Sequence, residues 1–130
     1  MMFKQVLGNK KIKNQLISSV ENNRIAHAHL FSGESGGSKL IIAIAFAQYI
    51  NCKNKLKEDS CGDCPSCKKY ENLTHPDLHL IFPVLTNSKI KKPISDNYIT
   101  EFREEVLKNP YLTLNNWFDM FSKDNKTGKQ

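Results

Sequence analysis

Apolar residues recur with the period of an α-helix in several stretches of the chain. Between Lys11 and Asn23 they fall on one face of a predicted helix, at Ile12, Leu16, Ile17 and Val20. The run from Ser38 to Asn51 is apolar nearly throughout, which is typical of a buried helix. Further helical segments are predicted over residues 66–73, 97–108 and 112–121. Asn9 and Ser95 are placed to cap the helices that follow them.

Two short apolar runs are typical of buried strands. One is Ala28-His29-Leu30-Phe31-Ser32, and the other is Leu78-His79-Leu80-Ile81-Phe82, which Pro83 ends. We also expect residues 3–8 to be extended. The order helix, strand, loop, helix predicts an α/β fold with parallel strands flanked by helices. Two strands are too few for a complete doubly wound sheet.

A glycine-rich loop lies between the first predicted strand and the helix over 38–51. It reads Gly33-Glu34-Ser35-Gly36-Gly37-Ser38-Lys39-Leu40. A phosphate-binding loop needs a glycine, four residues, and then Gly-Lys-Ser/Thr. Gly33 and Lys39 fit, whereas Ser38 replaces the second glycine and Leu40 replaces the hydroxyl residue. The loop therefore predicts either a degenerate phosphate site or an ordinary glycine/serine turn with a solvated lysine.

Each residue type in such a loop has a physical role. Glycines at 33, 36 and 37 let backbone N–H groups approach phosphate oxygens, and the following helix adds its own free N–H groups. Ser38 lies in this backbone, and Lys39 would supply a cation. Leu40 has no oxygen to bind Mg²⁺, so magnesium is not expected here. Binding of ATP or ADP is possible but weak or absent, and hydrolysis is not expected.

Four cysteines lie close together at Cys52, Cys61, Cys64 and Cys67, with the spacing Cys-x8-Cys-x2-Cys-x2-Cys. Tetrahedral zinc takes four such sulfur ligands at about 2.3 Å. The pattern predicts a zinc knuckle over residues 52–67, with free buried thiols or an iron–sulfur cluster as alternatives. Four thiolates leave no open coordination position, so the predicted zinc is structural. His75 and His79 are expected to serve in capping and packing rather than as ligands.

Composition and charge agree with a globular protein and exclude several classes. The chain has 39% hydrophobic and 25% charged residues, the balance of a folded rather than a disordered chain. No apolar run could span a bilayer and no signal peptide opens the chain, so we expect a cytoplasmic protein without a membrane partner. The net charge of +6 favours nucleic acid or an acidic protein as partner, although a lysine- and asparagine-rich composition alone can produce it.

The remaining segments carry less chemistry. Residues 84–95 are predicted to form a basic loop with Lys89, Lys91 and Lys92, and residues 122–130 a polar tail. The aromatic residues near Trp117 are interpreted as core. No apolar strand that ends in an acidic pair occurs in the chain, although a hydrolytic phosphate-loop domain needs one.

Together these features resemble the AAA+ clamp-loader subunits of bacterial DNA polymerase III. The resemblance covers about residues 3–85 and rests on motifs in the same order: Val6-Leu7-Gly8-Asn9, residues 24–33, the glycine-rich loop, the cysteine cluster and His75-Pro76-Asp77. It implies that Gly33, Gly36, Gly37 and Lys39 match the phosphate loop and that the four cysteines match zinc ligands. It also implies that the acidic box, sensor, arginine finger, lid and collar lie outside these residues, which makes this chain the N-terminal part of a longer AAA+ protein.

The family has two branches that share the zinc knuckle, and the altered loop is similar to the delta prime branch rather than the tau/gamma motor. The resemblance implies a subunit without ATPase activity of its own, inside the DNA-directed DNA polymerase III holoenzyme. The expected partners are the tau/gamma and delta subunits, the sliding clamp and, through the complex, primed DNA. Two alternatives are an ATP-hydrolysing tau/gamma-type subunit and a zinc module that binds nucleic acid through Lys53, Lys55, Lys57, Lys68 and Lys69.

Overall fold

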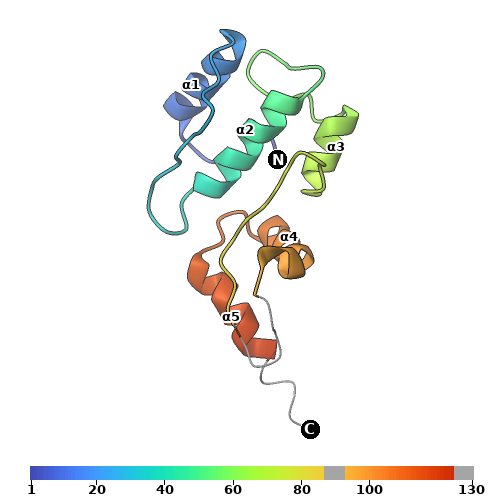
Figure 1. Ribbon diagram of the computed structural model, residues 1–130. Coiled ribbons are helices and arrows are strands. Elements are labelled where there is room, and N and C mark those ends of the chain that lie inside the picture. Colours follow the sequence, from blue (N-terminus) through green and yellow to red (C-terminus); the bar gives the residue numbers. More distant parts are fainter. Residues whose placement is uncertain (87–92, 125–130) are drawn as a thin grey trace. The chain divides into compact units, whose positions relative to one another are not determined.

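The computed structural model describes residues 1–86 and 93–124, and the chain divides into two compact units. The first unit runs from Met1 to Leu78, and the second begins at His79. The first contains a short 3-10 helix, η1 (Phe3–Gln5), and three α-helices, α1 (Lys10–Glu21), α2 (Lys39–Asn51) and α3 (Pro65–Glu71) (Figure 1). The second contains η2 (Ser95–Tyr98), α4 (Ile99–Lys108) and α5 (Leu114–Asp124).

Helix α2 is the centre of the first unit. Its buried side chains lie on all sides of the helix and include Ile41, Ile44 and Ala45. An apolar helix of this kind has to be covered on several faces, and η1, α1 and α3 all pack against it. Helix α1 buries Leu16 and Ile17, which belong to the apolar face predicted for it.

The core of the second unit is aromatic. The rings of Phe82 and Phe102 stack with their centroids 3.9 Å apart, and Trp117 meets both edge-on at 5.4 and 5.1 Å. Trp117 is only 2% exposed, and its indole N–H donates to the Pro83 carbonyl oxygen at 2.7 Å. Phe121 packs edge-on against Trp117 at 4.9 Å. The interpretation of the aromatic residues near Trp117 as core is confirmed for Trp117, whereas Phe118 and Phe121 are only partly buried.

The predicted helices are confirmed, with ends that differ by at most three residues. The predicted caps are wrong in detail. Asn9 precedes α1 but lies in the left-handed region at φ 58°, and its side chain makes no capping hydrogen bond. The Ser95 hydroxyl instead exchanges hydrogen bonds with the backbone of Phe82, at 3.2 Å from its N–H and 2.8 Å from its carbonyl oxygen.

The predicted strands are not found. Residues 1–86 and 93–124 contain no strand, so the structure shows a helical chain and not the parallel sheet of the expected α/β fold. A strand needs hydrogen-bond partners from another segment, and Leu30 and Ile81 lie 93% and 92% exposed in the two runs expected to be strands. Residues 3–8, expected to be extended, begin with η1 because Met2 and Phe3 carbonyls accept from the Gln5 and Val6 N–H groups.

Only the ends of the predicted basic loop (residues 84–95) and the first residues of the predicted tail (residues 122–130) fall within the described residues. Residues 84–86, 93 and 94 have no regular structure, and Ser95 already begins η2. Lys89, Lys91 and Lys92 lie outside the described residues, as do residues 125–130. Residues 122–124 belong to α5, and the rest of the predicted tail lies outside the described residues. No helix in the described part of the chain is long and apolar enough to cross a membrane.

Candidate functional site

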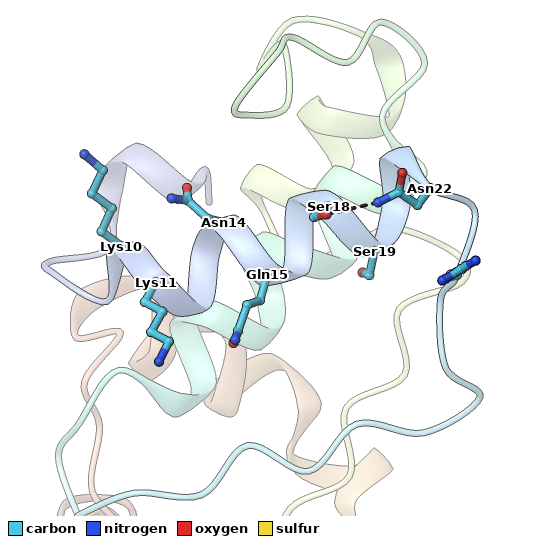
Figure 2. Close-up of a pocket in the computed structure, with 8 residues that line it drawn as sticks. Lys10, Lys11, Asn14, Gln15, Ser18, Ser19 and Asn22 are labelled. Carbon is cyan, nitrogen blue, oxygen red and sulfur yellow. Dashed lines mark hydrogen bonds between the residues drawn. The ribbon is translucent and has the colours of Figure 1, made fainter.

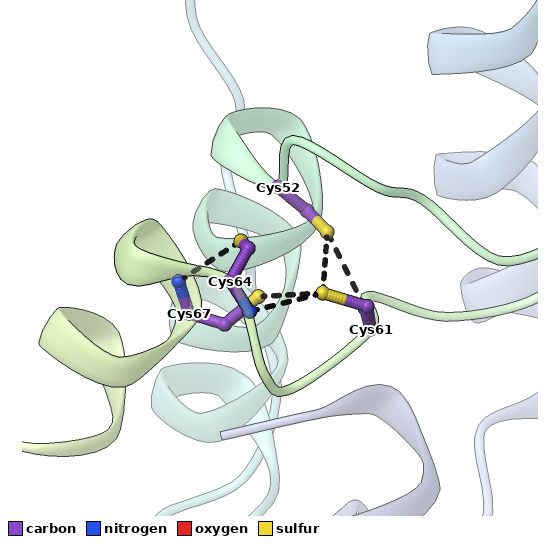
Figure 3. A group of neighbouring side chains, drawn as sticks. All are labelled: Cys52, Cys61, Cys64 and Cys67. Atoms are coloured by element: carbon purple, nitrogen blue, oxygen red, sulfur yellow. Dashed lines mark hydrogen bonds between the residues drawn. The ribbon is translucent and has the colours of Figure 1, made fainter.

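The four cysteine sulfurs converge on one point in the first unit (Figure 3). All four lie within 4.8 Å of one another. The Cys61 sulfur is 3.6 Å from that of Cys52 and 3.9 Å from that of Cys67. A tetrahedral ion with ligands at about 2.3 Å places its sulfurs about 3.8 Å apart. The cysteines are free rather than disulfide-bonded, and their separation fits four ligands around a single ion.

Local structure explains how each cysteine reaches the cluster. Cys52 ends α2 at the C-cap, and Cys64 begins α3 at the N-cap, followed by Pro65 at the first helical position, where its missing N–H costs nothing. Cys67 lies in the first turn of the same helix, one turn on from Cys64. Gly62 turns the chain between the cysteines at φ +78°, and a Cβ there would also come within 2.9 Å of the Met2 sulfur.

Backbone N–H groups surround the sulfurs as donors. The N–H of Cys61 donates to the Cys52 sulfur at 3.3 Å, and the N–H of Cys64 donates to the Cys61 sulfur at 3.3 Å. Hydrogen bonds from the backbone of Lys53 and of Cys67 lower the pKa of Cys64 to about 6. Burial raises the pKa of Cys67 to about 12. Donors of this kind orient metal-binding thiolates and lower their charge density.

The donor set suits a soft or borderline metal such as zinc. Four sulfurs with tetrahedral spacing and no nearby carboxylate or imidazole ligand match a closed structural site. The histidines behave as expected in one case: His75 stacks on Tyr70 with ring centroids 4.6 Å apart. His79 is exposed, and neither histidine belongs to the cluster.

The segment between Cys52 and Cys61 is tied to the start of the chain, which the sequence did not reveal. The Asp59 carboxylate accepts from the N–H groups of Phe3 and Lys4, both at 2.9 Å. Ser60 is fully buried and accepts a hydrogen bond from the Gln48 side chain at 3.0 Å. The segment between Cys52 and Cys61 therefore anchors η1 against α2.

Replacing Asp59 by alanine is expected to destabilise the first unit by about 1–3 kcal/mol, because three backbone N–H groups, those of Phe3, Lys4 and Ser60, lose a charged acceptor. Urea unfolding followed by circular dichroism measures this change. The matched control is Asp63→Ala, whose side chain is 92% exposed and should shift stability by less than about 0.5 kcal/mol. Equal effects of the two substitutions would contradict the anchoring role of Asp59.

The glycine-rich loop borders a cavity of about 560 Å³ in the first unit. Gly33, Gly37, Ser38 and Lys39 line it, whereas Gly36, at φ +75°, turns the loop without lining the cavity. The Lys39 ammonium donates to the Gly33 carbonyl oxygen at 2.9 Å. The structure therefore brings most of the predicted loop residues to one cavity.

Asn9 and His29 also line this cavity, and sequence reasoning gave neither a role in it. The Asn9 side chain donates to the Ser38 hydroxyl at 2.7 Å, so the residue that replaces the second glycine of the motif holds the loop to the segment before α1. His29 packs edge-on against Phe46 at 5.1 Å. The only feature of the sequence that could have indicated this role of Asn9 is its position just after Val6-Leu7-Gly8.

The lysines of the knuckle are not equally available to a partner. Lys68 lies 3.9 and 3.8 Å from the carboxylates of Asp63 and Glu71, and the Lys55 ammonium donates to the Cys52 carbonyl oxygen at 2.9 Å. Of the five lysines predicted to bind nucleic acid in the zinc-module alternative, these two already have partners within the first unit. Exposed ion pairs are weak, but they lower the free charge of this surface.

Comparisons with known proteins point to one family. A family model described as DNA polymerase III, delta subunit matches residues 8–117. The DNA polymerase III subunit delta' of Bacillus subtilis (strain 168) is 38% identical over 73 residues, which is 56% of this chain and 22% of the relative. The DNA polymerase III subunit tau/gamma of Haemophilus influenzae is 38% identical over 76 residues, 58% of this chain and 11% of the relative.

A third relative matches over more of the chain. The DNA polymerase III subunit gamma/tau of Mycoplasma genitalium is 31% identical over 109 residues, 84% of this chain and 17% of the relative. The chain thus spans between 11% and 22% of the length of these three relatives. No solved structure matches it significantly.

Proposed function

This chain belongs to the DNA polymerase III, delta subunit family, and we propose that it is the N-terminal part of a delta prime-like clamp-loader subunit that does not hydrolyse ATP. In this role the complete protein stabilises the cytoplasmic assembly with tau/gamma and delta subunits that places the sliding clamp on primed DNA. The lid, the collar and the remaining AAA+ motifs lie in other parts of the subunit.

The observation that carries this proposal is Leu40. It follows Lys39 at the start of α2, where a hydrolytic loop places the hydroxyl that binds Mg²⁺. Leu40 is half-buried and does not line the cavity. The cavity therefore offers a lysine and backbone groups for phosphate but no side-chain oxygen at the magnesium position.

The cysteine cluster supports the same proposal as a structural element. We propose zinc as its ion, because all four ligands are sulfur and their spacing fits one tetrahedral centre. The ion joins the end of α2 to the start of α3, and α2 begins at the glycine-rich loop. Cys52, Cys61, Cys64 and Cys67 would hold the ion, and no step of nucleotide chemistry involves it.

The test is an ATPase assay on the complete subunit with Mg²⁺ present. We expect no steady-state turnover, because the loop does not place the metal. Calorimetry with ATP or ADP then measures nucleotide binding alone. If the loop holds phosphate, Lys39→Ala should weaken this binding. Lys57→Ala, which changes an exposed lysine of the knuckle, is the matched control and should leave it unchanged. Magnesium-dependent turnover that Lys39→Ala abolishes would contradict the proposal.

The tau/gamma alternative has one observation in its favour. The Haemophilus influenzae tau/gamma relative is as similar to this chain, at 38% identity, as the Bacillus subtilis delta' relative. Identity therefore does not separate the two branches, and the distinction rests on the loop. An intact acidic box in the complete subunit together with measured ATP turnover would assign it to the motor branch.

A further inference from the structure

One sulfur of the cysteine cluster is more open to solvent than the others. Cys61 is partly exposed, whereas the other three cysteines are at most 6% exposed. Backbone N–H groups do not single out Cys61, because they donate to the sulfurs of Cys52 and Cys64 as well. Oxidation of a cysteine follows its thiolate character and its exposure. A metal-bound cysteine is a thiolate, so exposure makes Cys61 the sulfur that a small oxidant meets first.

The Cys52 sulfur lies beside that of Cys61, at 3.6 Å, and Figure 3 shows the two sulfurs facing each other. A disulfide needs a separation of about 2.05 Å, so one or both residues must move. Cys52 follows the last residue of α2, and Cys61 lies in the loop before α3. Cys64 and Cys67 belong to the start of α3, whose backbone resists displacement. Closing the distance is therefore easier between Cys61 and Cys52.

We propose that Cys61 and Cys52 form an oxidation site, at which a peroxide converts the two thiolates into a disulfide and the cluster loses its metal. The inference rests on the proposed zinc and goes beyond it, because it gives the cluster a chemical response in addition to its structural role. It involves neither the glycine-rich loop nor nucleotide.

The steps balance with hydrogen peroxide as the oxidant. The Cys61 sulfur attacks one peroxide oxygen, the O–O bond breaks and hydroxide leaves, which makes Cys61 a sulfenic acid. The Cys52 sulfur then attacks the Cys61 sulfur, the S–O bond breaks and a second hydroxide leaves. The two sulfurs together give up two electrons, and the two hydroxides take protons from the solvent to become water.

The disulfide leaves too few ligands for zinc. Only Cys64 and Cys67 keep free thiolates, whereas a structural zinc site needs four ligands. Loss of the metal removes its link between the end of α2 and the start of α3. Helix α3 has only seven residues and depends on tertiary support, so its backbone hydrogen bonds should open more often in the oxidised protein. In a reducing compartment such a disulfide is transient, as redox-sensing disulfides are.

The test treats the complete subunit, purified with zinc under reducing conditions, with hydrogen peroxide after the reductant has been removed. A coloured chelator follows the release of zinc, of which we expect about one per chain. Amide hydrogen exchange over residues 65–71 should become faster in the oxidised protein. Dithiothreitol with added zinc should reverse both changes.

Mass spectrometry of tryptic peptides identifies the disulfide. Trypsin cleaves after Lys53 and Lys57, which separates Cys52 from the other three cysteines in the sequence. A disulfide between Cys52 and Cys61 therefore joins two peptides, whereas a disulfide among the other three cysteines stays within one peptide. We expect the joined pair, and fragmentation of it should place the second sulfur at Cys61.

Two histidine substitutions test the same assignment. Cys61→His removes the exposed sulfur and supplies another ligand that zinc accepts, so this variant should retain its zinc in peroxide. Cys64→His is the matched control, because it keeps Cys61 and Cys52 and should release zinc as the wild-type subunit does. Both variants are compared only if they contain zinc before oxidation, and otherwise the peptides of the wild-type subunit decide.

A further control adds an exposed thiol elsewhere. Ser18 lies on the exposed side of α1, in a depression lined by polar side chains and by no cysteine (Figure 2). Ser18→Cys should be oxidised without any additional release of zinc. This control separates reaction at the cluster from oxidation of exposed thiols in general.

Three results would overturn the inference. These are zinc that stays bound to the wild-type subunit in peroxide, a disulfide confined to the peptide that carries Cys61, Cys64 and Cys67, and release of zinc from Cys61→His at the wild-type rate. A subunit that holds no zinc before oxidation would contradict the proposed metal and the inference together. Zinc that is present but insensitive to peroxide would contradict the inference alone.

Discussion

Replacing Cys64 and Cys67 together by serine is expected to remove the bound zinc and to unfold the first unit around α3. Structural zinc contributes about 10–16 kcal/mol in zinc-finger peptides, which is comparable to the whole stability of a typical domain. Helix α3 has only seven residues, and a helix of that length does not persist without tertiary support. Elemental analysis should find about one zinc in the wild-type chain and none in the variant.

A matched control lies between the two substituted residues. Ser66 is buried, and its hydroxyl has no hydrogen-bond partner. Ser66→Ala removes that hydroxyl and leaves all four sulfurs, so zinc content should stay unchanged and stability should not fall. Zinc content that is unchanged by the double cysteine substitution would contradict the assignment of the zinc to this cluster. Iron instead of zinc in the purified chain would identify iron as the ion that the cysteines bind.

The same site predicts a dependence on pH. A thiol binds the metal only after it loses its proton, and burial raises the pKa of Cys67 to about 12. Metal binding near neutral pH must therefore release that proton, and affinity for the metal falls as pH falls. Cys64, whose pKa is lowered to about 6, is already largely deprotonated near neutrality, so it releases little proton there. It regains its proton only as pH falls through about 6, which lowers metal affinity further. Proton release on titration with zinc, followed with a pH indicator, measures the effect.

Replacing Trp117 by alanine is expected to destabilise the second unit by about 3–5 kcal/mol. The substitution removes the side chain that meets Phe82 and Phe102 edge-on and leaves the Pro83 carbonyl without its donor. Urea unfolding followed by circular dichroism measures the loss, because Trp117 is the only tryptophan in the chain and its own fluorescence disappears with it.

Two controls sharpen this experiment. Trp117→Phe keeps an aromatic ring but loses the hydrogen bond to Pro83, so it should cost less than the alanine substitution, with about 1 kcal/mol of its loss from the hydrogen bond. Zinc content should be unchanged in both variants, because the cysteines belong to the first unit. A loss of less than about 1 kcal/mol in Trp117→Ala would contradict its assignment as the centre of the core.

The start of the chain links the two candidate sites of the first unit through direct contacts. Asp59, two residues before Cys61, accepts from the N–H groups of Phe3 and Lys4. Further along, the Asn9 side chain donates to the Ser38 hydroxyl in the glycine-rich loop. One short segment of the chain therefore contacts both the knuckle and the glycine-rich loop.

Local patterns in the sequence determined the helices and the cysteine cluster. The period of apolar residues placed α1 and α2 because a helix is stabilised by contacts within one segment and by one buried face. The spacing of Cys61, Cys64 and Cys67 determined the sulfur cluster because a knuckle is built from a few consecutive residues. The departures from the phosphate-loop motif at Ser38 and Leu40 were likewise visible in the sequence alone.

Tertiary structure alone decided what depends on distant segments. The short apolar runs around Leu30 and Ile81 predicted strands, but a strand forms only when another segment supplies its hydrogen bonds, and the described residues supply none. The contacts of Asp59 with Phe3 and of Asn9 with Ser38 join residues 56 and 29 positions apart. No local pattern marks such pairs, because they arise only when the chain has folded around α2.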